Sequence, residues 1–175
     1  MQDARFTGFQ RDQIAFSKST DGGRTWSRPL RINRDRFTQA FTASIEVDAD
    51  GNLGVTYYDF RNEDPATLVL ETDAWFARSN DGGISWSEER ITPASFDMRA
   101  APDARGYFVG DYEGLAASRT AFKPFFSQSF RSGTDVFGTT AHPPFPTATI
   151  TPDPAEGGNF KPNQFPTQKG KPTPR

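Results

Sequence analysis

The chain has 175 residues, enough for one domain of ordinary size, and it contains no cysteine, which excludes disulfides, thiolate catalysis and cysteine-ligated metals. With 20 Lys and Arg against 22 Asp and Glu, its formal charge of −2 gives no reason to expect nucleic acid as a partner. No window approaches the roughly 20 apolar residues of a membrane span, and no signal peptide is visible.

Short strands joined by turns are predicted for residues 1–141. Aromatic residues reach 14% of the chain, Gly and Pro number 15 and 14, and no long stretch shows a helical stripe. The strand-like runs lie at 13–17, 44–48, 53–58 and 74–78. The step Asp50-Gly51 between the second and third runs indicates a hairpin, because Gly accepts the positive φ of such turns. The predicted fold class is therefore all-β.

A nine-residue pattern occurs twice along the chain. Residues 19–27 read STDGGRTWS and residues 79–87 read SNDGGISWS, at a constant offset (81 − 21 = 60). In each copy the Asp carboxylate can accept turn N–H groups, the glycines permit positive φ, and the Trp can anchor the hairpin by filling a core gap. The residues predicted to build these turns are Ser19, Asp21, Gly23, Trp26, Ser79, Asp81, Gly83 and Trp86.

This pattern resembles the Asp box of the sialidase, or bacterial neuraminidase repeat, family of β-propellers. Two further segments are similar to the repeat-type members of that family: GDYEGLAA at 110–117 and YYDFR at 57–61. The resemblance implies that each box joins the third and fourth strands of a propeller blade. Third strands are then expected at about 12–18 and 73–79, and fourth strands at about 25–32 and 85–91.

The spacing of the boxes implies only part of a ring. Residues 10–33 would supply two strands of one blade, 43–92 a complete four-stranded blade, and 107–140 about three strands near 113–118, 121–127 and 134–139. The domain prediction is a partial sialidase-like propeller over 1–141, with about two to two and a half blades of a six-bladed ring. The remainder is expected from a longer chain, of which this would be the carboxy-terminal portion; a ring of identical chains is the alternative.

Residues 142–175 differ in composition from the rest of the chain. They hold nine of the 14 prolines and few apolar residues, so too little surface can be buried to offset the entropy of ordering them. We interpret this segment as a Pro-rich disordered tail.

Catalytic and binding residues are predicted only through the resemblance. Sialidase-type catalysis uses an arginine triad for the substrate carboxylate, a Tyr nucleophile activated by a Glu, and an Asp that handles a proton. The loops 33–42, 59–72 and 92–112 would form that face of the ring. There the resemblance implies Tyr112 and Asp59 as catalytic residues and Arg61 and Arg99 as substrate-binding residues. Other ionisable residues in or beside these loops are Arg36, Asp97, Asp111 and Glu113.

Structural interpretations stand beside each of these assignments. Arg61 could instead pair with Asp59 or Glu63 to fix the strand end, and Tyr112 could pack at the start of a strand. Glu113 is not expected to assist Tyr112, because adjacent strand residues point to opposite faces. The Asp boxes lie on the opposite face of the ring in the family, so Asp21 and Asp81 are expected to be structural.

No cofactor and no metal site is predicted. The segment Asp48-x-Asp50-x-Asn52 is similar to the start of a calcium loop, but no Glu follows at the twelfth position, which favours a plain hairpin. His142, the only histidine, cannot build a histidine-based metal site alone.

Three functional hypotheses remain open at this point. The first is a fragment of an exo-sialidase-like glycoside hydrolase acting on terminal sialic acids, inactive alone. The second is a non-catalytic repeat propeller that binds carbohydrate or protein. The third is a degenerate product without activity. A glycan or glycoconjugate is the expected ligand, and an extracellular or cell-surface location is expected for the parent protein.

Overall fold

A computed structural model describes residues 1–110, 113–119, 121–130, 133–141 and 150–152. Two short 3-10 helices, η1 (Ala4–Thr7) and η2 (Met98–Ala100), are the only helices among the described residues. The strands are β1 (Gln2–Asp3), β2 (Gln13–Phe16), β3 (Leu30–Arg31), β4 (Ala40–Val47), β5 (Leu53–Asp59), β6 (Glu71–Ser79), β7 (Ser87–Arg90), β8 (Phe96–Asp97), β9 (Gly114–Ala117), β10 (Phe122–Phe130) and β11 (Gly133–Gly138).

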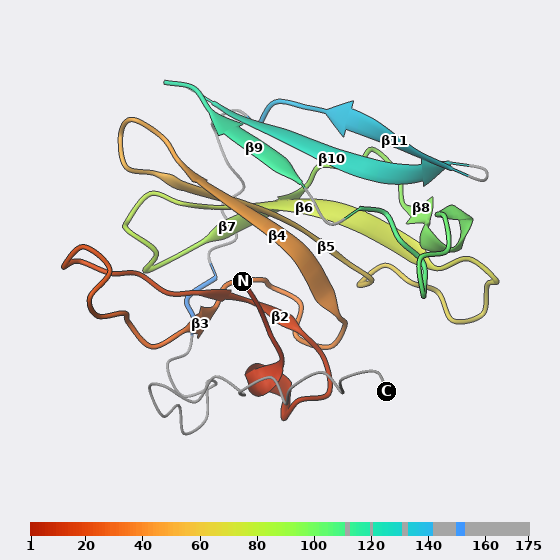
Figure 1. Ribbon diagram of the computed structural model, residues 1–175, viewed down its shortest axis with the longest axis horizontal. Helices are drawn as coiled ribbons and strands as arrows, with labels where there is room; N and C mark the ends of the chain where they lie inside the picture. Colours follow the sequence, from red (N-terminus) through yellow and green to blue (C-terminus); the bar gives the residue numbers. More distant parts are fainter. Residues whose placement is uncertain (111–112, 120, 131–132, 142–149, 153–175) are drawn as a thin grey trace, which may run out of the picture.

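The strands form three antiparallel sheets that lie one upon another (Figure 1). The first sheet has the order β1-β2-β3, the central sheet has the order β4-β5-β6-β7 with β8 paired to β6, and the third sheet has the order β11-β10-β9. None of the three closes into a barrel. The all-β prediction is therefore confirmed, whereas a sialidase-type ring remains a prediction.

One face of the central sheet packs on the first sheet. Alternate residues of a strand point to the same face, and Val55 and Tyr57 of β5 lie opposite Ala77 and Trp75 of β6. These residues join a buried cluster with side chains from the first sheet and the segments beside it, namely Ile14, Phe16 and Ile32. Packing of two hydrophobic sheet faces is thus what fixes the first sheet in place.

The opposite face of the central sheet packs on the third sheet. Tyr58 and Ala74 lie in one cluster with Phe126 of β10, and Phe76 packs against Phe122 with ring centroids 5.4 Å apart. A Cβ added to Gly54 would stand 2.7 Å from the Phe122 ring, so only glycine leaves room for this contact. The central sheet is therefore buried on both faces.

The strand positions agree with the sequence prediction to within a few residues in most places. The predicted strands near 113–118, 121–127 and 134–139 correspond to β9, β10 and β11. The strand predicted at 25–32 is shorter than expected, because only Leu30–Arg31 pairs with β2. Its first half belongs to the turn, and Pro29 lacks the N–H that a ladder needs.

Two pairings were not predicted from the sequence. β1 adds a third strand to the first sheet, with Gln2 opposite Ile14 and Asp3 opposite Gln13. Ile150, which lies in the predicted tail, forms an antiparallel bridge with Trp86 through N–H···O contacts of 2.9 and 2.6 Å. This bridge forms because the backbone of Trp86 offers both a donor and an acceptor. Most of the predicted tail, 142–149 and 153–175, lies outside the described residues.

The two Asp boxes form the same turn. In the first, Asp21 accepts the backbone N–H of Thr25 at 2.9 Å and its hydroxyl at 2.6 Å. In the second, Asp81 accepts the N–H of Ser85 at 2.9 Å and also its hydroxyl. Each carboxylate also accepts the hydroxyl of the first Ser of its box, and that Ser oxygen accepts the N–H of the second Gly.

These hydrogen bonds stabilise the ionised carboxylates. Hydrogen bonds from Thr25 and Ser19 lower the pKa of Asp21 to about 2. For Asp81, burial would raise the pKa, but hydrogen bonds from Ser85 and Ser79 outweigh it and bring the value to about 2. All four box glycines have positive φ, between 72° and 87°. Both Asp residues are thus occupied with holding their turns.

The tryptophans of the two boxes have opposite environments. Trp86 is 1% exposed, packs edge-on against Phe16 at 5.2 Å and is paired with Ile150. Trp26 is 65% exposed. The expectation that both tryptophans fill a core gap is therefore wrong for Trp26. The reason is that the first sheet covers the second box, whereas no described sheet packs in the same way over the first box.

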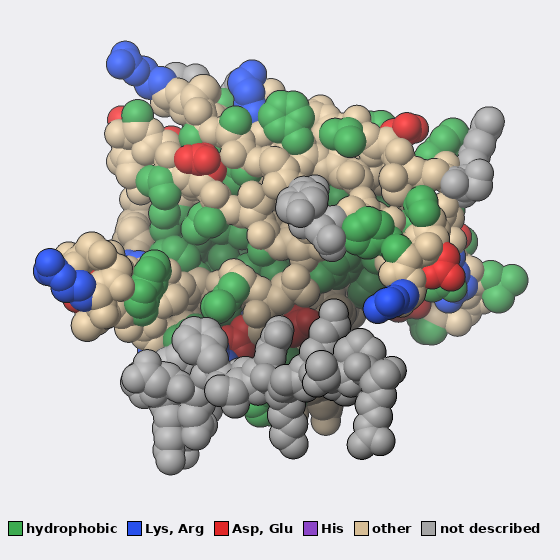
Figure 2. Space-filling model, viewed as in Figure 1, with side chains coloured by type: hydrophobic (Ala, Val, Ile, Leu, Met, Phe, Trp, Pro, Cys, Tyr) green, Lys and Arg blue, Asp and Glu red, His purple; other side chains and the backbone are tan. Residues whose placement is uncertain are grey.

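Hydrophobic side chains also reach the surface. Figure 2 shows them across the middle of one face, with Lys and Arg side chains toward its margins. On the third sheet, Phe125 is 46% and Val136 75% exposed. Among the described residues, no helix is long and apolar enough to cross a membrane.

The contrast between the two tryptophans gives a matched test. We expect Trp86→Ala to lower the free energy of unfolding by about 3–5 kcal/mol, because it leaves a cavity under Phe16. The same substitution at Trp26 should change it by about 0.5 kcal/mol or less, because the ring is mostly in water. Urea denaturation followed by circular dichroism measures both. Equal losses would contradict the packing described for the two boxes.

Candidate functional site

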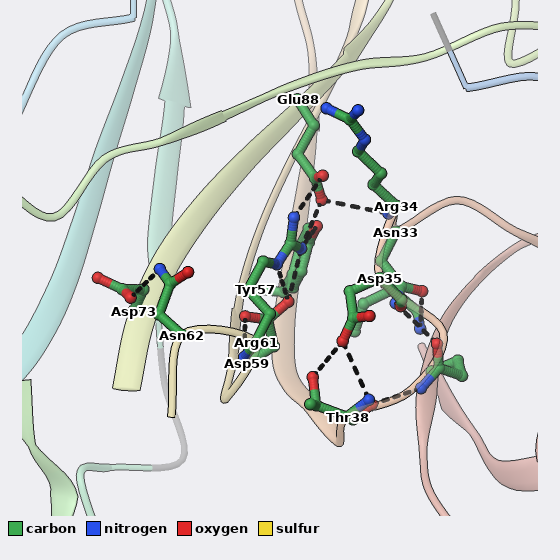
Figure 3. A network of polar contacts seen from close by, with 12 residues as sticks. Asn33, Arg34, Asp35, Thr38, Tyr57, Asp59, Arg61, Asn62, Asp73 and Glu88 are labelled. Atoms are coloured by element: carbon green, nitrogen blue, oxygen red, sulfur yellow. Dashed lines mark hydrogen bonds and ion pairs between the residues drawn. The ribbon is translucent and has the colours of Figure 1, made fainter. Parts of the chain in front are cut away.

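Arg61, just after the end of β5, is the centre of a buried polar network (Figure 3). Its Nε donates to Asp59 at 2.6 Å, and Nη1 and Nη2 donate to the two oxygens of Glu88 at 2.8 and 2.9 Å. Nη2 also donates to the Tyr57 hydroxyl at 3.0 Å. The guanidinium thus engages two carboxylates and a phenol at once, in the forked geometry that arginine favours.

The network is closed to solvent. The Arg61 guanidinium carbon lies 3.7 Å from the centroid of the Trp75 ring, a cation–π contact. The side chain of Arg61 is 14% exposed, while those of Asp59 and Glu88 are 1% and 3% exposed. Asp59 and Arg61 therefore lie together, as the sequence predicts, but they face each other rather than an open pocket. The pairing of Arg61 with Asp59, the structural alternative, is present.

Burial and pairing act in opposite directions on the pKa of each carboxylate in this network. Burial raises the pKa of Asp59, and hydrogen bonds from Arg61 oppose the rise. Burial also raises the pKa of Glu88, although a bidentate guanidinium favours its charged form and the backbone N–H of Arg34 adds a contact of 3.3 Å. The positive charges of Arg34 and Arg31 also favour the ionised form of Glu88, but burial outweighs them and its pKa remains raised.

A second polar cluster surrounds Asp73, which lies opposite Asp59 in the register of β5 and β6. Asp73 is 1% exposed and accepts hydrogen bonds from Thr92 at 2.5 Å, Asn62 at 2.7 Å and Ser95 at 2.8 Å. Every one of these donors comes from a loop. Asp73 therefore ties the loops after β5 and β7 to the sheet, which is a structural role.

The other predicted site residues lie elsewhere. Arg99 is exposed in η2, its guanidinium donates to the carbonyl of Leu68, and its backbone N–H donates to Asp97 at 3.0 Å. The partners of Arg99 thus differ from those of Arg61, which binds Asp59 and Glu88. Tyr112 and Asp111 lie outside the described residues.

Glu113 occupies an unusual position between the central and third sheets. Both of its carboxylate oxygens are buried without a hydrogen-bond partner among the described residues, as is the hydroxyl of Thr56. The Tyr58 hydroxyl, which shares this environment, donates to the carbonyl of Ser127 at 2.7 Å and accepts its N–H at 2.8 Å. Burial raises the pKa of Glu113 to about 8, and the nearby hydroxyls of Thr56 and Tyr58 only partly oppose that rise.

Comparison with known proteins adds no assignment. A scan against protein-family models finds no match, and a search of curated proteins finds no significant match. Within the part of the chain that the structure describes, no group of three or more His, Asp or Glu could hold a metal ion.

Several network residues were not predicted from the sequence. Glu88 stands in the run Ser87-Glu88-Glu89-Arg90, and the period of a strand shows only that adjacent residues of this run face opposite sides. Which Glu turns inward is decided by the register that sets Ala77 opposite Glu88. Tyr57 and Trp75 lie in predicted strands, but their contact with Arg61 depends on the pairing of β5 with β6.

Removal of the Arg61 guanidinium should destabilise the folded chain. We expect Arg61→Met to lower the free energy of unfolding by about 3–5 kcal/mol, because two buried carboxylates lose their partner. Adding Glu88→Gln to Arg61→Met should recover part of the loss, because one of those charges is removed. Arg24→Met, at an exposed arginine, is the control. A loss below about 1 kcal/mol for Arg61→Met would show that the network is not closed.

The pKa of Glu113 predicts a pH-dependent stability. Because the folded-state pKa of about 8 lies above the ordinary value of 4.5, stability is fully present below about pH 4.5 and is lost as pH rises toward 8. Glu113→Gln should remove this loss, so its advantage over the parent chain should grow across that range, to on the order of 3 kcal/mol. Glu63→Gln, at an exposed carboxylate, is the control. Parallel urea-midpoint curves for Glu113→Gln and the parent chain would contradict the burial of Glu113.

Proposed function

We propose that this chain forms part of a sialidase-like repeat β-propeller that acts on terminal sialic acids of glycans, and that it is inactive alone. The observation that carries the proposal is the pair of Asp-box turns, which use the same hydrogen bonds 60 residues apart (81 − 21 = 60) in successive sheets. The stacking of three antiparallel sheets supports it. Closed propellers need about four to eight blades, so the proposal includes further blades beyond those described.

Inactivity of the chain alone follows from where its polar groups lie. Asp59 and Arg61 bind each other inside the protein, where their side chains are only 1% and 14% exposed. A carboxylate-binding arginine must offer its guanidinium to the ligand, and a proton-transferring Asp must reach the reacting oxygen. In this proposal the described residues supply the scaffold of the ring, and the reacting groups come from elsewhere.

The alternative is a non-catalytic repeat propeller that binds carbohydrate or protein outside the cell. The enclosure of Arg61 also favours this alternative, because a binding propeller needs the blades without the catalytic groups. The two proposals share the fold and differ in chemistry alone.

Hydrolysis of a fluorogenic sialoside separates these proposals. We expect no turnover by the 175-residue chain, because its arginine and aspartate are enclosed. A longer product of the same gene that supplies the other blades should release the fluorophore if the ring is catalytic. Saturable binding of sialyllactose by the longer product without turnover would favour the binding propeller. Turnover by the 175-residue chain itself would contradict the enclosure of Arg61.

A further inference from the structure

The edge of the third sheet that β11 forms is exposed along its length. β11 is the terminal strand in the order β11-β10-β9, so no described strand pairs with its outer side. Residues 134–138 are all exposed. In Figure 1, β11 lies on the side of the molecule away from the first sheet. Neither the Asp-box turns nor the Arg61 network involves this edge.

The backbone groups of β11 alternate between its two sides. Thr139, just after the strand, donates its N–H to the carbonyl of Pro124 at 3.1 Å, and Phe137 lies opposite Phe126 in the same register. Because hydrogen-bonded positions alternate along an antiparallel ladder, residues 135, 137 and 139 direct their backbone groups toward β10. The backbone N–H and C=O groups of Thr134, Val136 and Gly138 therefore point away from the sheet, toward the position of a further strand.

The other edges of the described sheets carry features that oppose such pairing. β1 and β3 have two residues each and β9 has four, while three of the four residues of β7 are charged. In β4 the register shifts between Phe41 and Ser44, where Thr42 has a φ of 49°. Short strands, charges and bulges are the devices that keep sheet edges apart. β11 has none of them: it pairs regularly with β10 over six residues, contains no proline, and carries a single charge at Asp135.

Apolar side chains reach this edge on the outer face of the third sheet. Val136 is 75% exposed and Phe125, on the adjacent strand, is 46% exposed. The Phe125 ring lies toward β11, because a Cβ added at Gly138 would stand 3.2 Å from it. Apolar surface beside an open edge favours association, since pairing removes that surface from water.

We propose that β11 pairs antiparallel with β11 of a second copy of this chain, so that two third sheets join across a two-fold axis. The strand is self-complementary in the register centred on Val136. Val136 then faces Val136 of the second copy, and Thr134 faces Gly138, so every outward backbone group meets another outward group within the strand. The inference does not rest on the proposed function, because it needs only the edge of the third sheet.

Charge also favours this register. Asp135 faces Phe137 of the second copy, so no carboxylate meets another. A shift of one step toward Thr134 would set the two Asp135 side chains opposite each other, which is unfavourable for like charges in a ladder. A shift of one step the other way would leave Thr134 without a partner inside the strand. The Val136 register is therefore the one that the sequence of β11 fits.

Analytical ultracentrifugation of the full 175-residue chain tests this pairing. We expect a monomer–dimer equilibrium in which the mass rises with concentration from 19.4 kDa toward twice that value, without larger species, because a two-fold contact is closed. A chain that stays monomeric into the high micromolar range, with the circular dichroism spectrum of a folded β protein, would overturn the proposal.

Charged substitutions at Val136 test the register. Val136→Lys and Val136→Glu should each weaken dimerisation about tenfold or more, because like charges would face each other across the axis. An equimolar mixture of the two variants should form a heterodimer, because residue 136 of one copy meets residue 136 of the other. Val136 is mostly exposed, so the urea midpoints of both variants should match the parent's at concentrations where all are monomeric.

Thr134→Lys and Thr134→Glu are the matched controls on the same edge. Each new charge would face Gly138 of the second copy, so both variants should dimerise nearly as the parent chain does, and mixing them should bring no gain. Rescue by mixing at residue 134 but not at residue 136 would contradict the register. Undiminished dimerisation of Val136→Lys would exclude β11 as the contact. None of these results bears on sialoside hydrolysis, so the proposed function stands or fails separately.

Discussion

The central sheet presents apolar and aromatic side chains from both of its faces, and neither face can be left in water. Tyr57 and Tyr58 are adjacent in β5, point to opposite sides and are both buried, one toward the first sheet and one toward the third. An antiparallel sheet with one wet face would alternate polar and apolar residues, and β5 does not. The central sheet therefore needs the first and third sheets to cover its two hydrophobic faces.

The buried polar clusters around Arg61 and Asp73 support this packing of sheets. The Arg61 network closes the end of the central sheet, where a strand end beside a hydrophobic cluster needs its charges paired. Asp73 performs the same task one strand away by binding three loop side chains. Buried carboxylates of this kind add little net stability compared with apolar residues, but they fix the path of the loops.

The Arg61 network is complete without a ligand. Its guanidinium pairs with both Asp59 and Glu88, and the backbone N–H of Arg34 adds a contact to Glu88.

Repeats, turns and strand periods could be predicted from the sequence because each depends on neighbours along the chain. The Asp-box turn needs only the spacing of Ser19, Asp21 and Thr25, and the same spacing at residue 79 produces the same hydrogen bonds. The grouping of strands in the central and third sheets came instead from the resemblance to propeller blades.

The contacts between side chains that are distant in the sequence were decided by the tertiary structure. Trp26 and Trp86 occupy equivalent places in identical turns, yet one is exposed and the other buried, because only the second turn lies beneath Phe16 and Ile150. Likewise, the sequence places Arg61 beside Asp59. The second carboxylate that Arg61 binds, Glu88, lies in another strand, 27 residues further along the chain. Contacts of this kind depend on the register and stacking of sheets, and a sequence read along one strand carries no measure of either.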